Sequence, residues 1–183
     1  MNEILFNIAA INICTEAEGP YKRAAIWFQG CTIGCAGCCN PHFQSLEPEH
    51  IMTHDELIAV IHQSFIENNI EGVTYLGGEP TLQRNLVFLS ESVHKMGLGV
   101  ILFTGNTFSN LDPAFLKDVD MAIDGKYEQD LTDNRNLIGS SNQNIIFITD
   151  RYRSQTEWFL NPRGKRAEIN ISGNDIVFSG DVL

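Results

Sequence analysis

Residues 24–41 read AAIWFQGCTIGCAGCCNP, an apolar run that leads directly into a loop containing four of the five cysteines of the chain. The run over 24–29 has the length of a short buried strand. The loop that follows contains Gly30, Gly34 and Gly37, and this flexibility lets several thiols turn toward one centre. We therefore expect a strand that brings a cysteine-rich loop to one edge of a sheet.

Downstream of this loop, strand-like and helix-like patterns alternate. Thr53 and Glu56 form a capping-box pattern that predicts the start of a helix, and Gly97 is typical of the end of another. The helices expected are one that begins after Thr53, one over 82–96 and a short one over 113–117. The strands expected are 72–76, 100–104, 119–123 and 144–149.

This alternation predicts an α/β fold with a largely parallel sheet and right-handed crossovers, in a core domain over residues 1–150. A complete eight-fold barrel takes about 250 residues, so a chain of 183 predicts a partial, open (β/α) barrel instead. The cysteine loop, the GGEP loop at 77–80 and the loop after Asp124 each follow a predicted strand. Because parallel strands end at one edge of a sheet, we expect these three loops to converge.

The tail, residues 151–183, is predicted to be a C-terminal extension with a β-hairpin. Residues 167–172 and 175–179 read as two strands around a Gly-Asn turn. Ile169 and Phe178 alternate with polar residues, so we expect both on one buried face of the hairpin.

The composition restricts the class of protein. Twelve Lys and Arg against 23 Asp and Glu residues give a net charge of −11, and 43% of the residues are hydrophobic. Such a chain folds around a core, and its acidity argues against nucleic acid or an anionic membrane as a partner. No apolar run reaches the roughly 18 residues of a membrane span, and the N-terminus lacks the basic residues of a signal peptide. We therefore expect a cytoplasmic protein with reduced thiols.

The spacing of Cys31, Cys35 and Cys38 is C-x3-C-x2-C. In a reducing compartment, clustered thiols indicate a metal site or a reactive centre rather than disulfides. Three thiolates suit a tetrahedral zinc ion, with Cys39 or His42 as the fourth ligand, or three corners of an iron–sulfur cube with one open iron. Small apolar cysteines of a core do not gather on a turn-rich loop, so the residues leave zinc and the cube as the alternatives.

The cysteine loop after one strand, combined with the GGEP loop after the next, resembles the radical S-adenosyl-L-methionine (SAM) superfamily. The resemblance implies that Cys31, Cys35 and Cys38 hold a 4Fe-4S cluster. It further implies that the fourth iron binds the amino and carboxylate groups of SAM. One electron then cleaves a sulfur–carbon bond of SAM and releases a 5′-deoxyadenosyl radical. The implied fold is the partial, open barrel of the radical SAM type.

The segments DGKYEQDL, residues 124–131, and GSSNQ, residues 139–143, are similar to the activating enzymes of glycyl-radical proteins. They resemble in particular the branch that activates the anaerobic ribonucleotide reductase. This implies a glycyl-radical enzyme as partner, a low-potential electron donor such as flavodoxin or ferredoxin, and no catalytic side chain beyond the cluster and SAM. The residues that the resemblance assigns to SAM binding are Asn40, Gly77, Gly78, Glu79, Asp124 and Lys126.

The sequence also departs from these enzymes. Cys39 stands where relatives often have an aromatic residue beside the adenine, and we expect it to be a thiol that does not bind the cluster. The tail runs past the compact form of the activating enzyme. Two other functions are therefore retained: a short radical SAM enzyme that acts on a small molecule or peptide, and a non-catalytic metal-binding adaptor that does not bind SAM.

Overall fold

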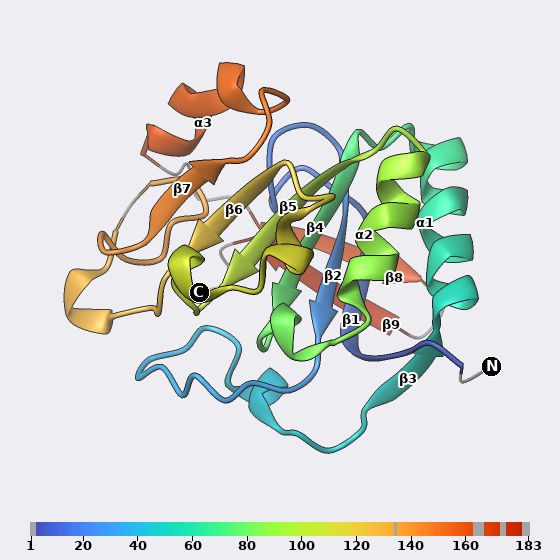
Figure 1. Ribbon diagram of the computed structural model, residues 1–183, viewed down its shortest axis with the longest axis horizontal. Coiled ribbons are helices and arrows are strands. Elements are labelled where there is room, and N and C mark those ends of the chain that lie inside the picture. Colours follow the sequence, from blue (N-terminus) through green and yellow to red (C-terminus); the bar gives the residue numbers. More distant parts are fainter. Residues whose placement is uncertain (1–2, 134, 163–166, 173–174, 181–183) are drawn as a thin grey trace.

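The computed structural model describes residues 3–133, 135–162, 167–172 and 175–180 (Figure 1). Within these residues, seven strands form one sheet in the order β3-β1-β2-β4-β5-β6-β7. Their bounds are β1 Leu5–Thr15, β2 Arg23–Phe28, β3 His50–Thr53, β4 Gly72–Gly77, β5 Gly99–Thr104, β6 Met121–Asp124 and β7 Asn144–Phe147. The four central strands β2, β4, β5 and β6 are parallel, so the predicted α/β fold with a mostly parallel sheet is confirmed.

The outer strands are antiparallel, which the sequence pattern did not predict. β1 pairs with both β2 and β3, and neither β1 nor β3 was expected. At the opposite side of the sheet, β7 is antiparallel to β6, and Asn144 at the start of β7 pairs with Asp124 at the end of β6. The chain therefore enters β7 at the end of the sheet where it leaves β6. The connection over 125–143 has a 3₁₀ turn, Gln129–Leu131, where a parallel neighbour usually has a crossover helix.

Two helices cover one face of the sheet (Figure 1). Helix α1, His54–Asn68, begins with the predicted capping box, since Thr53 and Glu56 bond each other's backbone amides. Helix α2, Leu86–Lys95, lies beside it. The expected helix over 113–117 is a 3₁₀ turn, Pro113–Leu116. The buried core between the helices and the sheet includes Phe28, Leu57, Tyr75, Leu89 and Val100.

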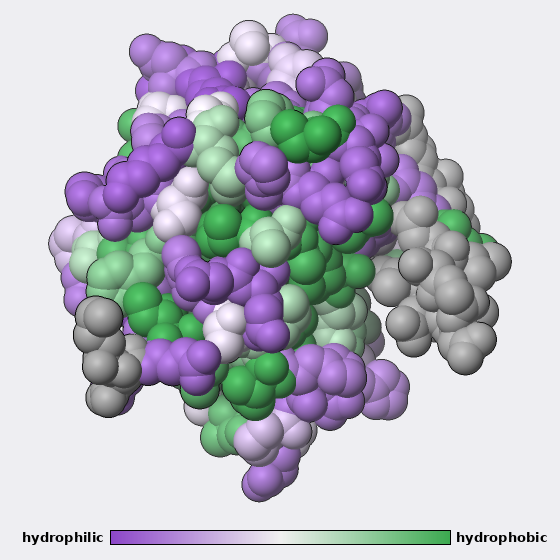
Figure 2. All heavy atoms as spheres, turned by 90° about the vertical axis from the view of Figure 1, so that its right-hand side faces the viewer, coloured by the Kyte–Doolittle hydropathy of each residue, from purple (hydrophilic) through white to green (hydrophobic). Residues whose placement is uncertain are grey.

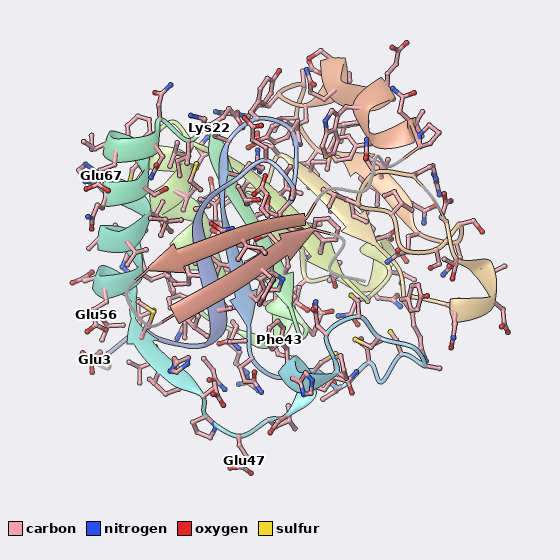
Figure 3. All side chains as sticks on the ribbon, turned by 180° about the vertical axis from the view of Figure 1, so that it is seen from behind. Glu3, Lys22, Phe43, Glu47, Glu56 and Glu67 are labelled. Atoms are coloured by element: carbon pink, nitrogen blue, oxygen red, sulfur yellow. The ribbon has the colours of Figure 1, made fainter. Side chains whose placement is uncertain are left out.

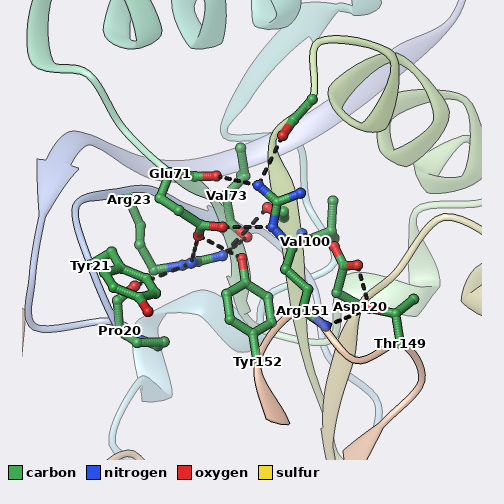
Figure 4. A network of polar contacts seen from close by, with 12 residues as sticks. Pro20, Tyr21, Arg23, Glu71, Val73, Val100, Asp120, Thr149, Arg151 and Tyr152 are labelled. Carbon is green, nitrogen blue, oxygen red and sulfur yellow. Dashed lines mark hydrogen bonds and ion pairs between the residues drawn. The ribbon is translucent and has the colours of Figure 1, made fainter. Parts of the chain in front are cut away.

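Residues after 150 also pack on the sheet. Helix α3, Thr156–Leu160, contributes the fully buried Phe159 to a second apolar cluster with Ile101 and Met121. At the amino-terminal ends of the parallel strands, the side chain of Glu71 connects this segment to the core (Figure 4). Its carboxylate accepts hydrogen bonds from the buried Arg23 at 2.8 Å and from the Tyr152 hydroxyl at 2.7 Å.

The predicted hairpin is present as β8, Ala167–Ser172, and β9, Asp175–Gly180. Its turn, Gly173-Asn174, lies outside the described residues. Seen from behind in Figure 3, the hairpin crosses the face of the sheet opposite to the helices.

The expected burial of Ile169 and Phe178 is wrong, because these cross-strand neighbours are 59% and 49% exposed. The hairpin turns polar groups toward β1 instead: Ser179 accepts from Asn12 at 2.6 Å, and Glu168 accepts from Thr15 at 2.5 Å.

The surface over α1, α2 and β3 mixes hydrophilic and apolar side chains, and Figure 2 shows this side of the molecule. Its exposed large apolar residues include Ile51, Ile66 and Phe88. Exposed apolar side chains of this kind are ordinary on protein surfaces. In the described part of the chain, no helix is long and apolar enough to cross a membrane.

Candidate active site

The cysteine loop leaves the carboxyl end of β2, as predicted. None of its four cysteines is in a disulfide; Cys31, Cys35 and Cys38 are half-buried, whereas Cys39 is exposed. The three residues predicted as ligands are thus less exposed than Cys39. That Cys39 is not a ligand stays a prediction.

Two of the three half-buried cysteines accept a hydrogen bond from a backbone amide at sulfur. The N–H of Ile33 donates to the sulfur of Cys31 and the N–H of Asn40 to that of Cys38, both at 3.4 Å. Amide donors of this kind surround the thiolate ligands of iron–sulfur clusters and tune their reduction potentials.

The pKa of Cys35 indicates which groups surround its thiol. Burial raises this pKa above its ordinary value, and the nearby thiols of Cys38 and Cys31 raise it further. The Tyr127 amide and the ammonium group of Lys126 act in the opposite direction. The three cysteines and Lys126 therefore lie in one electrostatic neighbourhood, although 88 residues separate Cys38 from Lys126 in the sequence.

The donor set of the cysteine loop fits an iron–sulfur cube. The thiolates of a cube each bind a different iron, so three cysteines on one loop can supply three of its corners. Cys31, Cys35 and Cys38 are half-buried on one loop, and the sulfurs of Cys31 and Cys38 each have a backbone amide donor.

The GGEP loop lies flat against the start of the cysteine loop. The amide of Gly78 donates to the carbonyl of Phe28, and the amide of Glu79 donates to the carbonyl of Gly30, both at 2.8 Å. A Cβ atom on Gly78 would lie 2.2 Å from the Gly30 oxygen, and one on Gly77 would lie 2.4 Å from the Phe28 backbone. Both glycines are thus required for one predicted loop to pack against the other.

The carboxylate of Glu79 is buried inside the protein, with 1% of the residue exposed. It accepts from the hydroxyl groups of Thr81 at 2.6 Å and Thr104 at 2.9 Å, and from the amide of Gly105 at 2.8 Å. The side chain therefore connects the GGEP loop to the end of β5. Thr81 and Thr104 were not singled out in the sequence, because their role depends on a contact across strands.

Asp124 and Lys126 differ in exposure and in their partners. Asp124 is buried, and its carboxylate accepts from the amide of Phe108 at 2.6 Å and the side-chain amide of Asn144 at 2.9 Å. It connects the loop after β5 with the end of β6 and the start of β7. Lys126 is exposed beside Cys35, and its ammonium group makes no ion pair with a described residue. Lys126 is therefore available to an anionic ligand.

Two close contacts hold the cysteine loop between its neighbours. A Cβ atom on Gly37, which has a φ of +69°, would lie 2.8 Å from the side-chain oxygen of Gln129. A Cβ atom on Gly105 would lie 3.0 Å from the side chain of Ile33. The cysteine loop thus contacts the loops after β5 and β6, as the expected convergence required. Gln129 carries no motif that would have singled it out.

The GSSNQ segment closes the loop after β6 on itself. The side-chain amide of Gln143 donates to the carbonyl of Gly125 at 2.9 Å, and its oxygen accepts from the amides of Gly139 and Ser140. The hydroxyl of Ser140, which is fully buried, accepts from the amide of Glu128 at 3.1 Å. This segment therefore fixes the shape of the loop that carries Lys126.

Comparison with known proteins identifies relatives of this chain. A family model described as a 4Fe-4S single cluster domain matches residues 17–146, which include all three loops. An anaerobic ribonucleoside-triphosphate reductase-activating protein of Enterobacteria phage T4 is 30% identical over 153 residues, covering 79% of this chain and 96% of the relative. The protein of the same name from Vibrio cholerae is 31% identical, with 72% and 92% covered. A pyruvate formate-lyase-activating enzyme of Staphylococcus epidermidis is 32% identical, with 56% and 43% covered.

Proposed function

Since the chain belongs to the 4Fe-4S single cluster domain family and to the family of anaerobic ribonucleoside-triphosphate reductase-activating proteins, we propose that it is a radical SAM activating enzyme. Its product would be a glycyl radical on a partner enzyme, with the anaerobic ribonucleotide reductase as the partner. The observation that carries this proposal is the convergence of the cysteine loop, the GGEP loop and the loop that contains Lys126 and Gln129 at the carboxyl ends of parallel strands.

In this proposal Cys31, Cys35 and Cys38 hold the cluster. When bound, the cluster supplies the electron that cleaves SAM to methionine and a 5′-deoxyadenosyl radical. The amide donors on the sulfurs of Cys31 and Cys38 would stabilise the added negative charge of the reduced cluster. Cys39, exposed and next to a ligand, would take no part in binding.

SAM would bind across the edge where the loops meet. The proposed contacts are Lys126 with the SAM carboxylate, as a charge-assisted hydrogen bond, and the backbone of the GGEP loop with the amino group. Glu79 and Asp124 would act by orienting these loops, because their carboxylates are buried and bonded to the protein. The remaining proposed contributor is Asn40, whose amide faces the sulfur of Cys38.

The partner would enter through the open side of the sheet. We propose that the core, residues 1–150, is a partial barrel of the radical SAM type, and that residues 151–183 extend it. A barrel that does not close leaves room for a loop of a large protein at the carboxyl edge. A cytoplasmic location and a flavodoxin or ferredoxin as electron donor complete the proposal, since reduced thiols are required.

The test is an anaerobic assay. The protein is reconstituted with iron and sulfide, reduced and mixed with SAM, and 5′-deoxyadenosine is measured by chromatography. The reductase is then added, and its glycyl radical is sought by electron paramagnetic resonance. Cys35→Ala is the inactive control. Product without a radical on the reductase would favour a small-molecule substrate, and an intact cluster that does not bind SAM would contradict the enzyme proposal.

A further inference from the structure

Four hydrogen bonds form a closed ring between the GGEP loop and the loop after β5. The hydroxyl groups of Thr81 and Thr104 both donate to the same oxygen of Glu79, Oε1, at 2.6 and 2.9 Å. Both hydroxyl oxygens also accept from the half-buried Asn106. The side-chain N–H of Asn106 donates to Thr81 and its backbone N–H donates to Thr104, each at 3.1 Å. Asn106 therefore closes the ring on the side opposite to Glu79.

The chemistry of these groups fixes the direction of every bond in the ring. A carboxylate only accepts, an amide N–H only donates, and a hydroxyl has one proton to donate. Because each threonine gives its proton to Glu79, each hydroxyl oxygen can bond Asn106 only by accepting. The side chain of Asn106 therefore turns its NH₂ group, and not its oxygen, toward Thr81. A network in which every bond is satisfied in one direction is cooperative and rigid.

Asn106 also bonds the loop that carries Lys126. Its carbonyl oxygen accepts from the N–H of Gly125 at 3.1 Å, one residue before Lys126. The neighbouring Gly105 lies against the cysteine loop, since a Cβ atom on it would be 3.0 Å from the side chain of Ile33. This short segment thus contacts all three loops of the site, and Asn106 bonds two of them directly.

The two loops that Asn106 bonds are those that would hold one end of SAM. In the proposed function, the GGEP backbone contacts the amino group of SAM and Lys126 contacts the carboxylate. Both groups are attached to the same carbon atom of SAM, so their separation is fixed. A site that already has the matching separation spends less free energy on ordering when the ligand binds. The spacing of the GGEP loop and the Lys126 loop should therefore affect the affinity for SAM.

We propose that Asn106 is a positioning residue for SAM: it holds the GGEP loop and the Lys126 loop at the spacing that the amino and carboxylate groups of SAM require. This inference rests on the proposed function, because it requires that SAM binds where these loops meet. Asn106 would act through the Thr81 hydroxyl and the Gly125 amide, and would not itself touch SAM.

The test compares Asn106→Ala with Asn110→Ala, the same change at an exposed residue in the 3₁₀ turn Phe108–Asn110 of this loop. Both proteins are reconstituted anaerobically with iron and sulfide, and the Kd for SAM is measured by equilibrium dialysis. Asn106→Ala should keep the cluster and raise the Kd about fivefold, the factor that corresponds to the net contribution of one hydrogen bond. Asn110→Ala should bind SAM as tightly as the unchanged protein does.

A double-mutant cycle separates positioning from a general loss of structure. Thr81→Val removes the hydroxyl that accepts from Asn106, with little change of shape. Since Asn106 is proposed to act through this hydroxyl, adding Asn106→Ala to Thr81→Val should raise the Kd no further. Two unconnected effects would multiply instead.

A second variant covers poor assembly of the threonine variant. Asn106→Asp keeps the shape of the side chain but presents an oxygen to Thr81 in place of the donor. It should raise the Kd for SAM at least as much as Asn106→Ala does, and a lower Kd than that of Asn106→Ala would contradict the role of the N–H donor.

An unchanged Kd in Asn106→Ala, or effects that multiply in the cycle, would overturn the inference and leave the proposed function standing. Loss of the cluster from Asn106→Ala would also overturn it, because the role of the residue would then be structural. Failure of the unchanged, cluster-containing protein to bind SAM would instead refute the proposed function.

Discussion

Replacing Glu79 by glutamine removes one charge from the buried centre of the site without a change of shape. The carboxylate accepts four hydrogen bonds from described residues: two from Thr81, one from Thr104 and one from Gly105. Three of these donors face Oε1, and the fourth, the Gly105 N–H, faces Oε2. A glutamine has one acceptor oxygen, so its NH₂ group must take the place of Oε1 or of Oε2. The less costly orientation places the NH₂ group against the Gly105 N–H, which then has no acceptor.

The magnitude follows from these bonds. An unsatisfied buried N–H costs about 1–3 kcal/mol, and loss of charge assistance in the other three bonds adds about 1 kcal/mol. A neutral amide is less costly to bury than a carboxylate, which offsets part of the sum. With this offset, we expect Glu79→Gln to lower the free energy of unfolding by about 1–3 kcal/mol, or the midpoint temperature by about 2–12 °C for a chain of this size.

Urea unfolding followed by circular dichroism measures this difference under anaerobic conditions. The control is Glu91→Gln, which removes the same charge from an exposed pair with Lys95 at 2.9 Å and should leave the midpoint unchanged. A Glu79→Gln protein as stable as the control would show that the four bonds do not hold the GGEP loop to β5, and the reasoning would be wrong.

Three further predictions concern the ligands, SAM and the helix α1. Cys39→Ala should retain the iron and sulfide content of the unchanged protein while Cys35→Ala loses it, and an iron assay that shows loss in both would make Cys39 a ligand. Lys126→Met should keep the cluster and raise the Kd for SAM about tenfold, as measured by equilibrium dialysis. The reason is that one charge-assisted hydrogen bond contributes at least about 1.4 kcal/mol to binding. An unchanged Kd would exclude the proposed contact between Lys126 and SAM. The hydrogen bond from the Thr53 amide lowers the pKa of Glu56 in the folded protein below its ordinary value of 4.5. The ionised Glu56 side chain therefore stabilises the folded protein at pH values above 4.5, and this contribution is lost as the pH falls through the pKa of the folded protein. Urea unfolding should therefore show Glu56→Gln less stable than the unchanged protein at neutral pH and equally stable in acid, and a difference that persists in acid would contradict this.

Local patterns in the sequence were sufficient for the parts of this protein that depend on near neighbours. The capping box of α1 joins residues three positions apart, and the strand β2 with its cysteine loop is one continuous segment. Amphipathic spacing identified α1 and α2, and the short apolar runs identified the parallel strands. The cysteine spacing pointed to a metal centre for the same reason, since three donors within one loop need no other part of the chain to come together.

Contacts between distant segments could not be inferred from such patterns. β1 was missed because its burial is irregular and its partners, β2 and β3, are set by the sheet. The hairpin was recognised, but its buried face was assigned wrongly, because the polar side chains of β1 that it meets lie more than 150 residues earlier.

In the site, too, some features follow from local sequence and others from contacts between distant segments. The sequence alone determined the thiols, the GGEP and DGK loops and their position after successive strands. Only the tertiary structure decided that Gly78 is required by the Gly30 backbone and that Glu79 bonds Thr104. It also decided that Asn142 bonds the carbonyl of Lys126. The physical reason is that hydrogen bonds and close backbone contacts depend on distance in space, and the sheet brings these loops together whatever their separation along the chain.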